Sequence, residues 1–579
     1  MRFLRVDMNG LKAVVEEVPE KYRQLAGRGL TSRLVCDEVP ATAHPLGPKA
    51  KLFIAPGAVA GTSAPSSARV SVGGKSPLTW GIKEANAGTP VAQYLARLGL
   101  KAIIIEGEPK EPGKYWTLVV TKDGAEFVPA DEQTGKGLYE VYRGLKERHP
   151  TAGFIACGPA AEARMAMAGV CFSDTDGRPS RYSGRGGLGA VMAAKGLKLI
   201  VVDPAGTSPV VATNQELFKA GQAKLVEAIL THGVTKPGGT LNTYGTAALI
   251  NALNEAGGLP TRNFSSGRFE GAAKISGERM AEIVKERGGV GMMGQGCHPG
   301  CTIRCSNIYP KPDGTELVSC IEYESDWALG ANCGIDDLDA IAEMIWHCND
   351  LGIDTIECGV TIGVAMEAGL KKFGDAAGAL ALIDEIRKNT ALGRILGQGA
   401  AFTGRAFGVV RVPTVKGQGM PAYEPRAVKG IGVTYITSPM GADHTAGYTI
   451  APEILAVGGK ADPLSPAGKA DLSGAFQDTT AFIDMSGYCL FIAFPILDIA
   501  SGFEGMVETV NAVLGTSFAA GDVAKFGGEI VKWERQFNRA AGMTAAHDRP
   551  PEFMRYEKCP PHNQVYDVTD EDLDRIAGV

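Results

Sequence analysis

Long apolar runs are missing from this chain. No uncharged stretch reaches the roughly 20 residues that cross a bilayer, so we expect no membrane span. The opening MRFLRVDMNG has no apolar segment after its charges, so we expect no secretory signal. Twelve cysteines among 579 residues are too sparse for a disulfide framework. Together these features predict a reducing, cytoplasmic location, where clustered cysteines more often bind metal than pair.

Positive charge is also in short supply. The net charge is −6 and the pI is about 5.9, which argues against nucleic acid or an anionic membrane as the main partner. The chain is 45% hydrophobic with 76 glycines. That length and composition predict two to four domains, roughly, with ample material for large cores.

The pattern of apolar residues changes along the chain and predicts an α+β fold. Residues 1–205 are β-rich, with short branched or aromatic runs between glycine turns: LRVDM, KLFIA, ARVSV, KAIIIEG, YWTLVV and KLIVVD. Two helices are predicted among them, VAQYLARL and GLYEVYRGLKER. From about Asn214 helical spacing dominates, as in DLDAIAEMIWHCNDLG, with Asp336 or Asp337 as N-cap and Gly352 as stop. A Pro/Gly-rich stretch near 405–425 indicates a further boundary, so the predicted domains are 1–205, 206–405 and 406–579.

Three cysteines, Cys297, Cys301 and Cys305, lie within GQGCHPGCTIRCSN. Three clustered thiolates and one distant thiolate are what a cubane iron–sulfur cluster needs. Cys489 is a candidate fourth ligand, and four other cysteines remain open for that role: Cys320, Cys333, Cys348 and Cys358. Four thiolates also bind structural zinc, but zinc ligands usually come as two CxxC-type pairs. The pattern favours a cluster.

A glycine-rich loop, SRYSGRGGLGAVMAAKG, precedes a helix of small residues. Backbone N–H groups at such a helix start bind phosphate well, and Arg185 adds a fork-shaped cation. The alternative is a tight turn that lets a helix pack closely, and the sequence leaves both open.

Two motifs share one form: an acidic or amide residue, a glycine three positions on, and Asp or Cys five positions on. They are NDLGIDTIECG, residues 349–359, and DMSGYC, residues 484–489. Two copies suggest a pseudo-symmetric grip on one ligand by carboxylates that accept paired hydrogen bonds. The alternative is a helix C-terminus with a glycine cap.

Three residues are candidate proton handlers: Tyr323 and Glu324 in CIEYESDW, and His444 in SPMGADHTAG. With eight histidines in the chain, one in a glycine-rich loop stands out. A solvated acidic stretch and an ordinary loop histidine are the alternatives.

Taken together, these segments resemble the aldehyde:ferredoxin oxidoreductase family of tungsten enzymes over nearly the whole chain. The resemblance runs through AGRGLTSRL, GTSAPSSARVSVGGKSPLTWGIKEANAG, SGRGGLGAVMAAKGLKLI, EYESDWALGANCGIDDLDAI, NDLGIDTI and the late Asp-to-Cys motif. It implies an N-terminal two-sheet domain and two mostly helical domains, with a tungsten bis-pyranopterin and a [4Fe-4S] cluster between them.

The resemblance assigns roles by position. Segments that hold the pterin phosphates and a bridging Mg²⁺ match Arg69, Asn86, Gly88, Arg185 and Gly186. Pterin-contacting acids match Asp354 and Asp484. Cluster ligands match Cys297, Cys301, Cys305 and Cys489. Residues beside the metal match Glu324 and His444, with Tyr323 adjacent. Three departures stand out: three residues instead of two between the first two cluster cysteines, Asn349 in place of an acid, and Ala446 in place of a basic residue.

The implied reaction is oxidation of an aldehyde to a carboxylic acid with water. Glu324 is the expected general base, and His444 the donor that stabilises charge on oxygen. Electrons are expected to pass through the cluster to ferredoxin or a small iron–sulfur partner, and we expect an oligomer. Two alternatives remain: a low-potential reductase of an activated aromatic (aryl-CoA), which Cys358 as a metal ligand would favour, and a non-catalytic iron–sulfur electron-transfer subunit.

Overall fold

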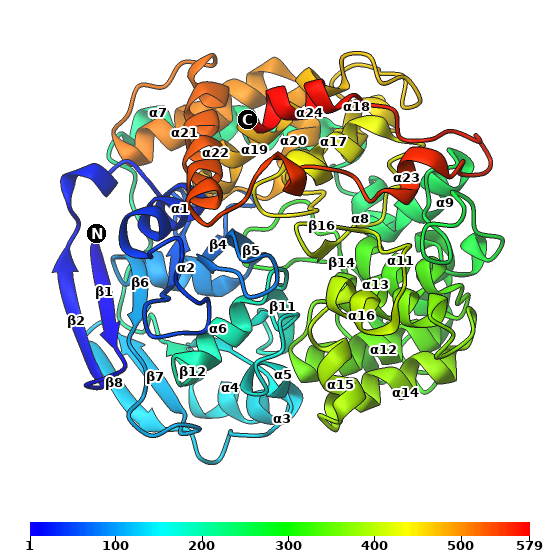
Figure 1. Ribbon diagram of the computed structural model, residues 1–579. Helices are drawn as coiled ribbons and strands as arrows, with labels where there is room; N and C mark the ends of the chain where they lie inside the picture. The colour runs from blue at the N-terminus through cyan, green and yellow to red at the C-terminus, as the bar shows by residue number, and fades with distance from the viewer. Residues whose placement is uncertain (579) are drawn as a thin grey trace.

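The computed structural model describes residues 1–578. Two sheets occupy the N-terminal part, one group of helices lies beside them, and the C-terminal helices lie across the top (Figure 1). The α+β class expected from the sequence is confirmed. Within residues 1–578, every helix is too short or too polar to cross a bilayer.

The first sheet has the strand order β2-β1-β6-β3-β4-β5. Its strands are β1 (Arg2–Asp7), β2 (Lys12–Glu17), β3 (Leu52–Pro56), β4 (Arg69–Lys75), β5 (Ile82–Gly88) and β6 (Leu100–Glu106). Helix α1 (Gly27–Glu38) packs on β3, β4 and β5. Strand β3 is buried along its whole length, which explains its continuous apolar sequence LFIAP.

The second sheet has the order β11-β10-β9-β12-β7-β8. Its strands are β7 (Trp116–Thr121), β8 (Gly124–Pro129), β9 (Gly153–Ala156), β10 (Val170–Ser173), β11 (Pro179–Ser183) and β12 (Leu197–Val202). The edge strands β5 and β11 contact each other. This contact matters because the polar residues on both strands then face the same space.

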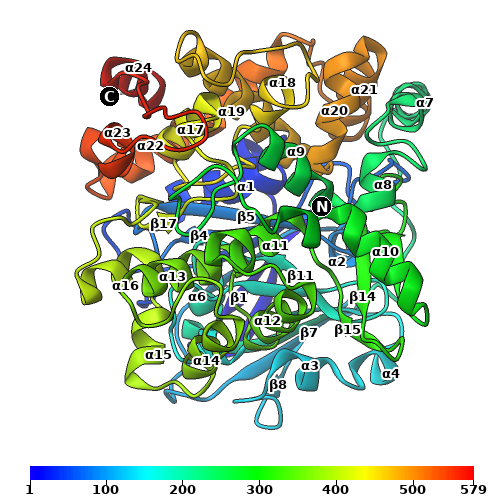
Figure 2. The same cartoon turned by 90° about the vertical axis from the view of Figure 1, so that its right-hand side faces the viewer.

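The middle part of the chain is mainly helical and covers the sheets on one side (Figure 2). Its helices include α7 (Gln215–Thr231), α10 (Gly277–Arg287), α11 (Tyr323–Leu329), α12 (Leu338–Leu351), α13 (Thr355–Glu367), α14 (Ala376–Arg387) and α16 (Ala400–Phe407). As predicted, Asp337 caps α12 through its side chain, and Gly352 ends the helix in the left-handed conformation. A small sheet of β13 (Met292–Gln295), β14 (Ser306–Pro310) and β15 (Glu316–Val318) interrupts the helices.

The C-terminal part adds a layer of helices above α1. Its longer members are α17 (Lys429–Thr437), α19 (Lys469–Ser486), α21 (Ala500–Leu514) and α22 (Asp522–Ala540). Helices α19 and α22 pack on each other and on α1, whereas α21 packs along α7. Helix α7 belongs to the predicted middle domain but packs against a C-terminal helix. The predicted domain boundaries near residues 205 and 405 stay predictions.

One predicted helix is wrong. The segment GLYEVYRGLKER forms two short helices, α3 (Leu138–Tyr142) and α4 (Leu145–Arg148). The break falls at Arg143, which has an extended backbone (ψ 126°), and at Gly144, which is left-handed (φ 71°). The apolar spacing continues across the break, so periodicity alone predicts one helix.

Candidate functional site

A cavity of about 360 Å³ lies where the two sheets meet the middle helices. Its walls come from β5, β11, the cysteine loop, α11 and the start of α13, and from loops of the C-terminal part. A second cavity of about 180 Å³ shares Arg69, Arg185 and His444 with it. Segments from all three parts of the chain therefore meet at one place.

The four predicted cluster cysteines all line the larger cavity. Cys297, Cys301 and Cys305 lie on the loop between β13 and β14, and Cys489 follows α19. The thiols of Cys297 and Cys301 and a ring nitrogen of His298 lie within 4.8 Å of one another. A hydrogen bond from Cys301, together with the cations Arg181 and Arg69, lowers the pKa of Cys297 to about 7 in spite of burial. At Cys297 this environment favours the thiolate that a metal requires, whereas the same hydrogen bond raises the pKa of Cys301 and burial raises that of Cys305.

Ser66, which the sequence analysis missed, ties the cysteine loop to Cys489. Its N–H donates to the carbonyl of Gly300 at 2.9 Å, and its carbonyl accepts the N–H of Cys489 at 2.8 Å. Its Oγ accepts the N–H of Thr302 at 3.2 Å. One serine therefore joins two segments that lie far apart in the chain.

The other cysteines that were open as fourth ligands separate into two groups. Cys320 lines the cavity and donates to Glu322 at 3.1 Å. Cys333, Cys348 and Cys358 are fully buried in the middle helices, and the cavity lining does not include them. Cys358 faces Cys348 instead. The structure does not bring Cys358 to the candidate site.

Arg69 and Asn86 connect the cysteines to the late acidic motif. Arg69 donates from Nη2 to Cys489 Sγ at 3.4 Å and from Nη1 to Asn86 Oδ1 at 3.3 Å. Asn86 Nδ2 donates to Asp484 Oδ1 at 3.3 Å, and Arg28 Nη1 donates to Asp484 Oδ2 at 3.1 Å. Gly88 lies so close to Cys297 that an added Cβ would be 2.9 Å from its sulfur. A side chain at position 88 would force the Cys297 sulfur to shift.

Arg185 and Asp354 form a buried ion pair that also lines the larger cavity. Arg185 Nε donates to Asp354 Oδ2 at 3.1 Å, and its Nη1 and Nη2 donate to the carbonyls of Ala442 and Gly419 at 2.7 Å each. All three guanidinium nitrogens are thus used within the chain. Asp354 also caps α13 through the N–H groups of Ile356 and Glu357.

Gly186 lines neither cavity, whereas the preceding residue, Arg185, lines both. It is left-handed (φ 86°), its carbonyl accepts Ser76 Oγ at 2.7 Å, and an added Cβ would be 2.5 Å from Lys83 Cγ. The tight-turn interpretation of the glycine loop therefore holds at Gly186.

Both acidic motifs end a helix with a left-handed glycine, Gly352 after α12 and Gly487 after α19. The residues five positions after the start of each motif, Asp354 and Cys489, nevertheless line the larger cavity. The glycine-cap alternative is therefore correct for both motifs, and the ligand interpretation stays a prediction that the glycine caps do not oppose.

Glu324 and His444 are neighbours on the wall of the larger cavity. Glu324 Oε1 lies 3.4 Å from His444 Nδ1, and both atoms are buried without a hydrogen-bond partner. Glu324 Oε2 accepts the N–H of Ala422 at 3.0 Å, which fixes the carboxyl group. Burial raises the pKa of Glu324 to about 8 and lowers the pKa of His444 to about 4. Near pH 7 both groups are mainly uncharged.

Tyr323 lines the cavity, but its hydroxyl is already used, because it donates to the carbonyl of Ala422 at 2.7 Å. Two tyrosines that the sequence analysis missed lie beside His444. Tyr423 and Tyr448 line the same cavity, and their hydroxyls are 2.9 Å apart. These three rings give one wall of the cavity an aromatic surface.

Charged residues on and near the second cavity were also missed. Lys83 and Asp443 pair at 3.3 Å, and Arg28 pairs with Glu534 at 2.8 Å. Burial and the nearby Asp484 carboxylate raise the pKa of Glu84 to about 8, and its Oε1 has no partner. No simple sequence signal separates these side chains from surface charges.

The cavity fits a large polar cofactor and a cluster. Buried polar atoms without partners lie on Glu324, His444 and Arg181, which line the larger cavity, and on Glu84, which lines the second cavity. Such atoms are costly unless a ligand satisfies them. A pterin offers both donors and acceptors, and four cysteines offer the ligand set of a cubane.

Two sheets facing helices across a cysteine-lined cavity define a cofactor-binding redox protein. Two family models agree: the N-terminal domain of aldehyde ferredoxin oxidoreductase matches residues 3–204, and its domains 2 and 3 match residues 222–576. The chain belongs to the aldehyde ferredoxin oxidoreductase family.

Proteins with similar sequences carry the name of this family. The tungsten-containing aldehyde ferredoxin oxidoreductase of Pyrococcus furiosus is 35% identical over 567 residues, covering 94% of this chain and 90% of the relative. The enzyme of the same name from Thermococcus kodakarensis is 35% identical over 575 residues, covering 96% and 91%. The BamBC active-site complex of benzoyl coenzyme A reductase, solved with 1,5-dienoyl-CoA, has a similar fold, with a TM-score of 0.80, 18% identity, and coverage of 99% of this chain and 92% of that one.

Proposed function

We propose that this chain is a tungsten bis-pyranopterin enzyme that oxidises an aldehyde to a carboxylic acid with water. Electrons leave through a [4Fe-4S] cluster to ferredoxin or a small iron–sulfur partner. The observation that carries the proposal is the position of Glu324 and His444 on the same cavity as the four cysteines. The names of the relatives supply the metal and the substrate class.

The residues that would hold the groups follow from the site. Cys297, Cys301, Cys305 and Cys489 would ligate the cluster. The cofactor would contact Asp354 and Asp484, and its phosphates and a bridging Mg²⁺ would lie near Arg69, Asn86, Gly88, Arg185 and Gly186. Because each guanidinium nitrogen of Arg185 already donates one hydrogen bond within the chain, we propose that Arg185 positions this loop, and that backbone groups hold the phosphates together with its two remaining N–H groups.

Tungstopterin, when bound, supplies the two-electron redox chemistry. The chain supplies the proton chemistry. Glu324 Oε1 has a free lone pair on the cavity, and its raised pKa makes it a strong base once it is ionised. It takes a proton from the water that adds to the carbonyl carbon. His444, neutral because burial lowers its pKa, donates a ring N–H to the carbonyl oxygen.

Tyr323 has a positioning role in this scheme. Its hydroxyl donates to the Ala422 carbonyl, and the N–H of Ala422 donates to Glu324 Oε2. The tyrosine therefore holds the backbone that holds the base.

The two alternatives have less support. An aryl-CoA reductase was favoured by Cys358, which is buried against Cys348 outside the cavity lining. The likeness to BamBC is one of fold alone. A non-catalytic relay does not need Glu324 and His444 with unpaired atoms on the cavity, and these atoms are present.

Aldehyde-dependent reduction of a viologen dye, under strict anaerobiosis, tests the function. We expect dye reduction with a panel of aliphatic and aromatic aldehydes and formation of the matching acids. Protein that contains tungsten and iron but oxidises none of them would contradict the proposal. Dye-coupled reduction of an aryl-CoA instead would favour the first alternative.

A further inference from the structure

Arg181 is a buried cation with unused hydrogen-bond donors. It lies on β11 and is 8% exposed. Its Nη1 donates to Ser306 Oγ at 2.7 Å, whereas Nε and Nη2 have no partner. Burying unpaired donors of a charged group costs several kcal/mol, roughly. The chain itself therefore leaves two nitrogens of Arg181 available to a ligand.

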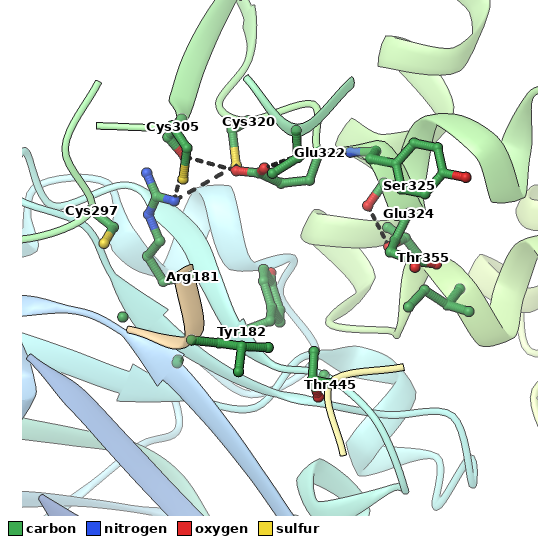
Figure 3. A pocket seen from close by; sticks show the side chains of 18 of the residues that line it. Arg181, Tyr182, Cys297, Cys305, Cys320, Glu322, Glu324, Ser325, Thr355 and Thr445 are labelled. Carbon is green, nitrogen blue, oxygen red and sulfur yellow. Dashed lines mark hydrogen bonds between the residues drawn. The ribbon is translucent and has the colours of Figure 1, made fainter. Parts of the chain in front are cut away.

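The guanidinium of Arg181 faces the cysteine end of the cavity. Figure 3 shows it between Cys297 and Cys320, below Cys305. All four residues line the same cavity. Ser306, which accepts the bond from Nη1, directly follows Cys305 in the chain. This bond keeps the guanidinium beside the predicted cluster ligands.

A network of polar residues holds Ser306 and Cys320 in place. Glu322 Oε1 accepts Ser306 Oγ at 2.9 Å and Cys320 Sγ at 3.1 Å, and Glu322 Oε2 accepts Thr246 Oγ1 at 2.6 Å. Arg181 Nη1 also lies 3.7 Å from Cys320 Sγ, so Glu322 is linked to Arg181 through Ser306 and Cys320. The free N–H groups and the charge of Arg181 remain directed at the cavity.

The other arginines near the site are used differently. Arg185 has no free nitrogen, and Arg69 binds Asn86 and Cys489. Arg178 directly precedes β11 and does not line the cavity. Its guanidinium pairs with three carboxylates, those of Asp174, Asp176 and Glu316. Among these four arginines, Arg181 is the one with buried nitrogens that lack partners.

We propose that Arg181 donates its free N–H groups to the sulfur atoms of the iron–sulfur cluster and raises the reduction potential of the cluster. This inference rests on the proposed function, which supplies the cluster. Cys297, Cys301, Cys305 and Cys489 would hold a cluster that carries one electron at a time, and the negative charge beside Arg181 would grow by one on reduction. Hydrogen bonds to the sulfurs and a nearby buried cation stabilise that form.

The test compares Arg181→Gln with wild type and with Arg178→Gln, a control that removes an arginine outside the cavity. Iron and sulfide are measured first, and the potential of the cluster is then measured by dye-mediated titration with EPR detection. We expect all three proteins to hold the cluster. At a fixed potential, the ratio of reduced to oxidised cluster is expected to fall about tenfold in Arg181→Gln, equivalent to about 59 mV for a one-electron couple. Arg178→Gln should match wild type.

An unchanged ratio in Arg181→Gln with the cluster present overturns the inference, as does loss of pterin with an unchanged ratio. If Arg181→Gln is isolated without iron, the same ratio of reduced to oxidised cluster is measured in Arg181→Lys. Lysine keeps the charge but not the fork of donors, so the ratio should fall about threefold, and a wild-type ratio overturns the inference. Wild-type protein without iron and sulfide would overturn the proposed function itself, so the two failures are distinguishable.

Discussion

Replacing Glu324 by glutamine is expected to lower kcat for aldehyde oxidation by about 10²–10⁴-fold, the usual contribution of a general base. Glutamine keeps the shape of the side chain and its contact with the N–H of Ala422, but it cannot accept a proton from water. The measurement is anaerobic viologen reduction, with tungsten, iron and pterin determined on the same sample. The metal content should stay at the wild-type level.

The pH dependence of the same reaction gives a second readout for Glu324. The base must be ionised, and burial raises its pKa to about 8. For wild type, kcat/KM should therefore rise with pH through a midpoint near 8, because the carboxylate becomes the major form above that value. The residual activity of Glu324→Gln should lack this rise. The surface variant Glu282→Gln should keep both rate and profile, since its side chain is 62% exposed.

Activity near wild type in Glu324→Gln would remove Glu324 from the role of base. A wild-type profile that stays flat from about pH 6 to 9 would contradict the ionisation argument.

Replacing Cys489 by serine is expected to abolish dye reduction and to lower the iron content. Cys489 lines the cavity with the three loop cysteines and contacts Arg69, and a serine hydroxyl is a poor ligand for iron. Without an intact cluster, electrons have no route from the cavity to the acceptor. Iron, acid-labile sulfide and the EPR signal of the reduced cluster are the measurements.

Cys358→Ser is the matched control for that variant. Its thiol is fully buried outside the cavity lining, so iron, sulfide and aldehyde activity should remain close to wild type. The opposite pattern, with activity lost in Cys358→Ser and kept in Cys489→Ser, would contradict the ligand assignment and favour the aryl-CoA alternative.

The strands of the sheets show where sequence patterns succeed and fail. The six apolar runs predicted as strands lie on β1, β3, β4, β6, β7 and β12. The other six strands of the two sheets, β2, β5, β8, β9, β10 and β11, were missed. Among them, β5 and β11, with the sequences IKEANAG and PSRYS, are edge strands that face each other. Both are polar because they line the cavity, and an edge strand that binds a ligand lacks the apolar alternation on which strand prediction depends.

The candidate site shows the same limit. The resemblance to the family placed Glu324, His444 and the four cysteines on one cavity, and the structure brings them together. Arg181, Ser66 and Tyr448 were not found, because their signals are long-range: an unpaired donor, a backbone bridge and a hydroxyl pair. The assignment of Arg185 to the phosphate-binding segment stays a prediction; its guanidinium also binds Asp354 and two carbonyls, contacts that no local pattern encodes.

Metal and cofactor analysis of anaerobically purified protein tests the central claim most directly. The account predicts tungsten and pterin together with about four iron and four sulfide per chain. Iron and sulfide without tungsten or pterin would contradict an enzyme and leave only an electron relay. Protein without any of them would contradict the whole account.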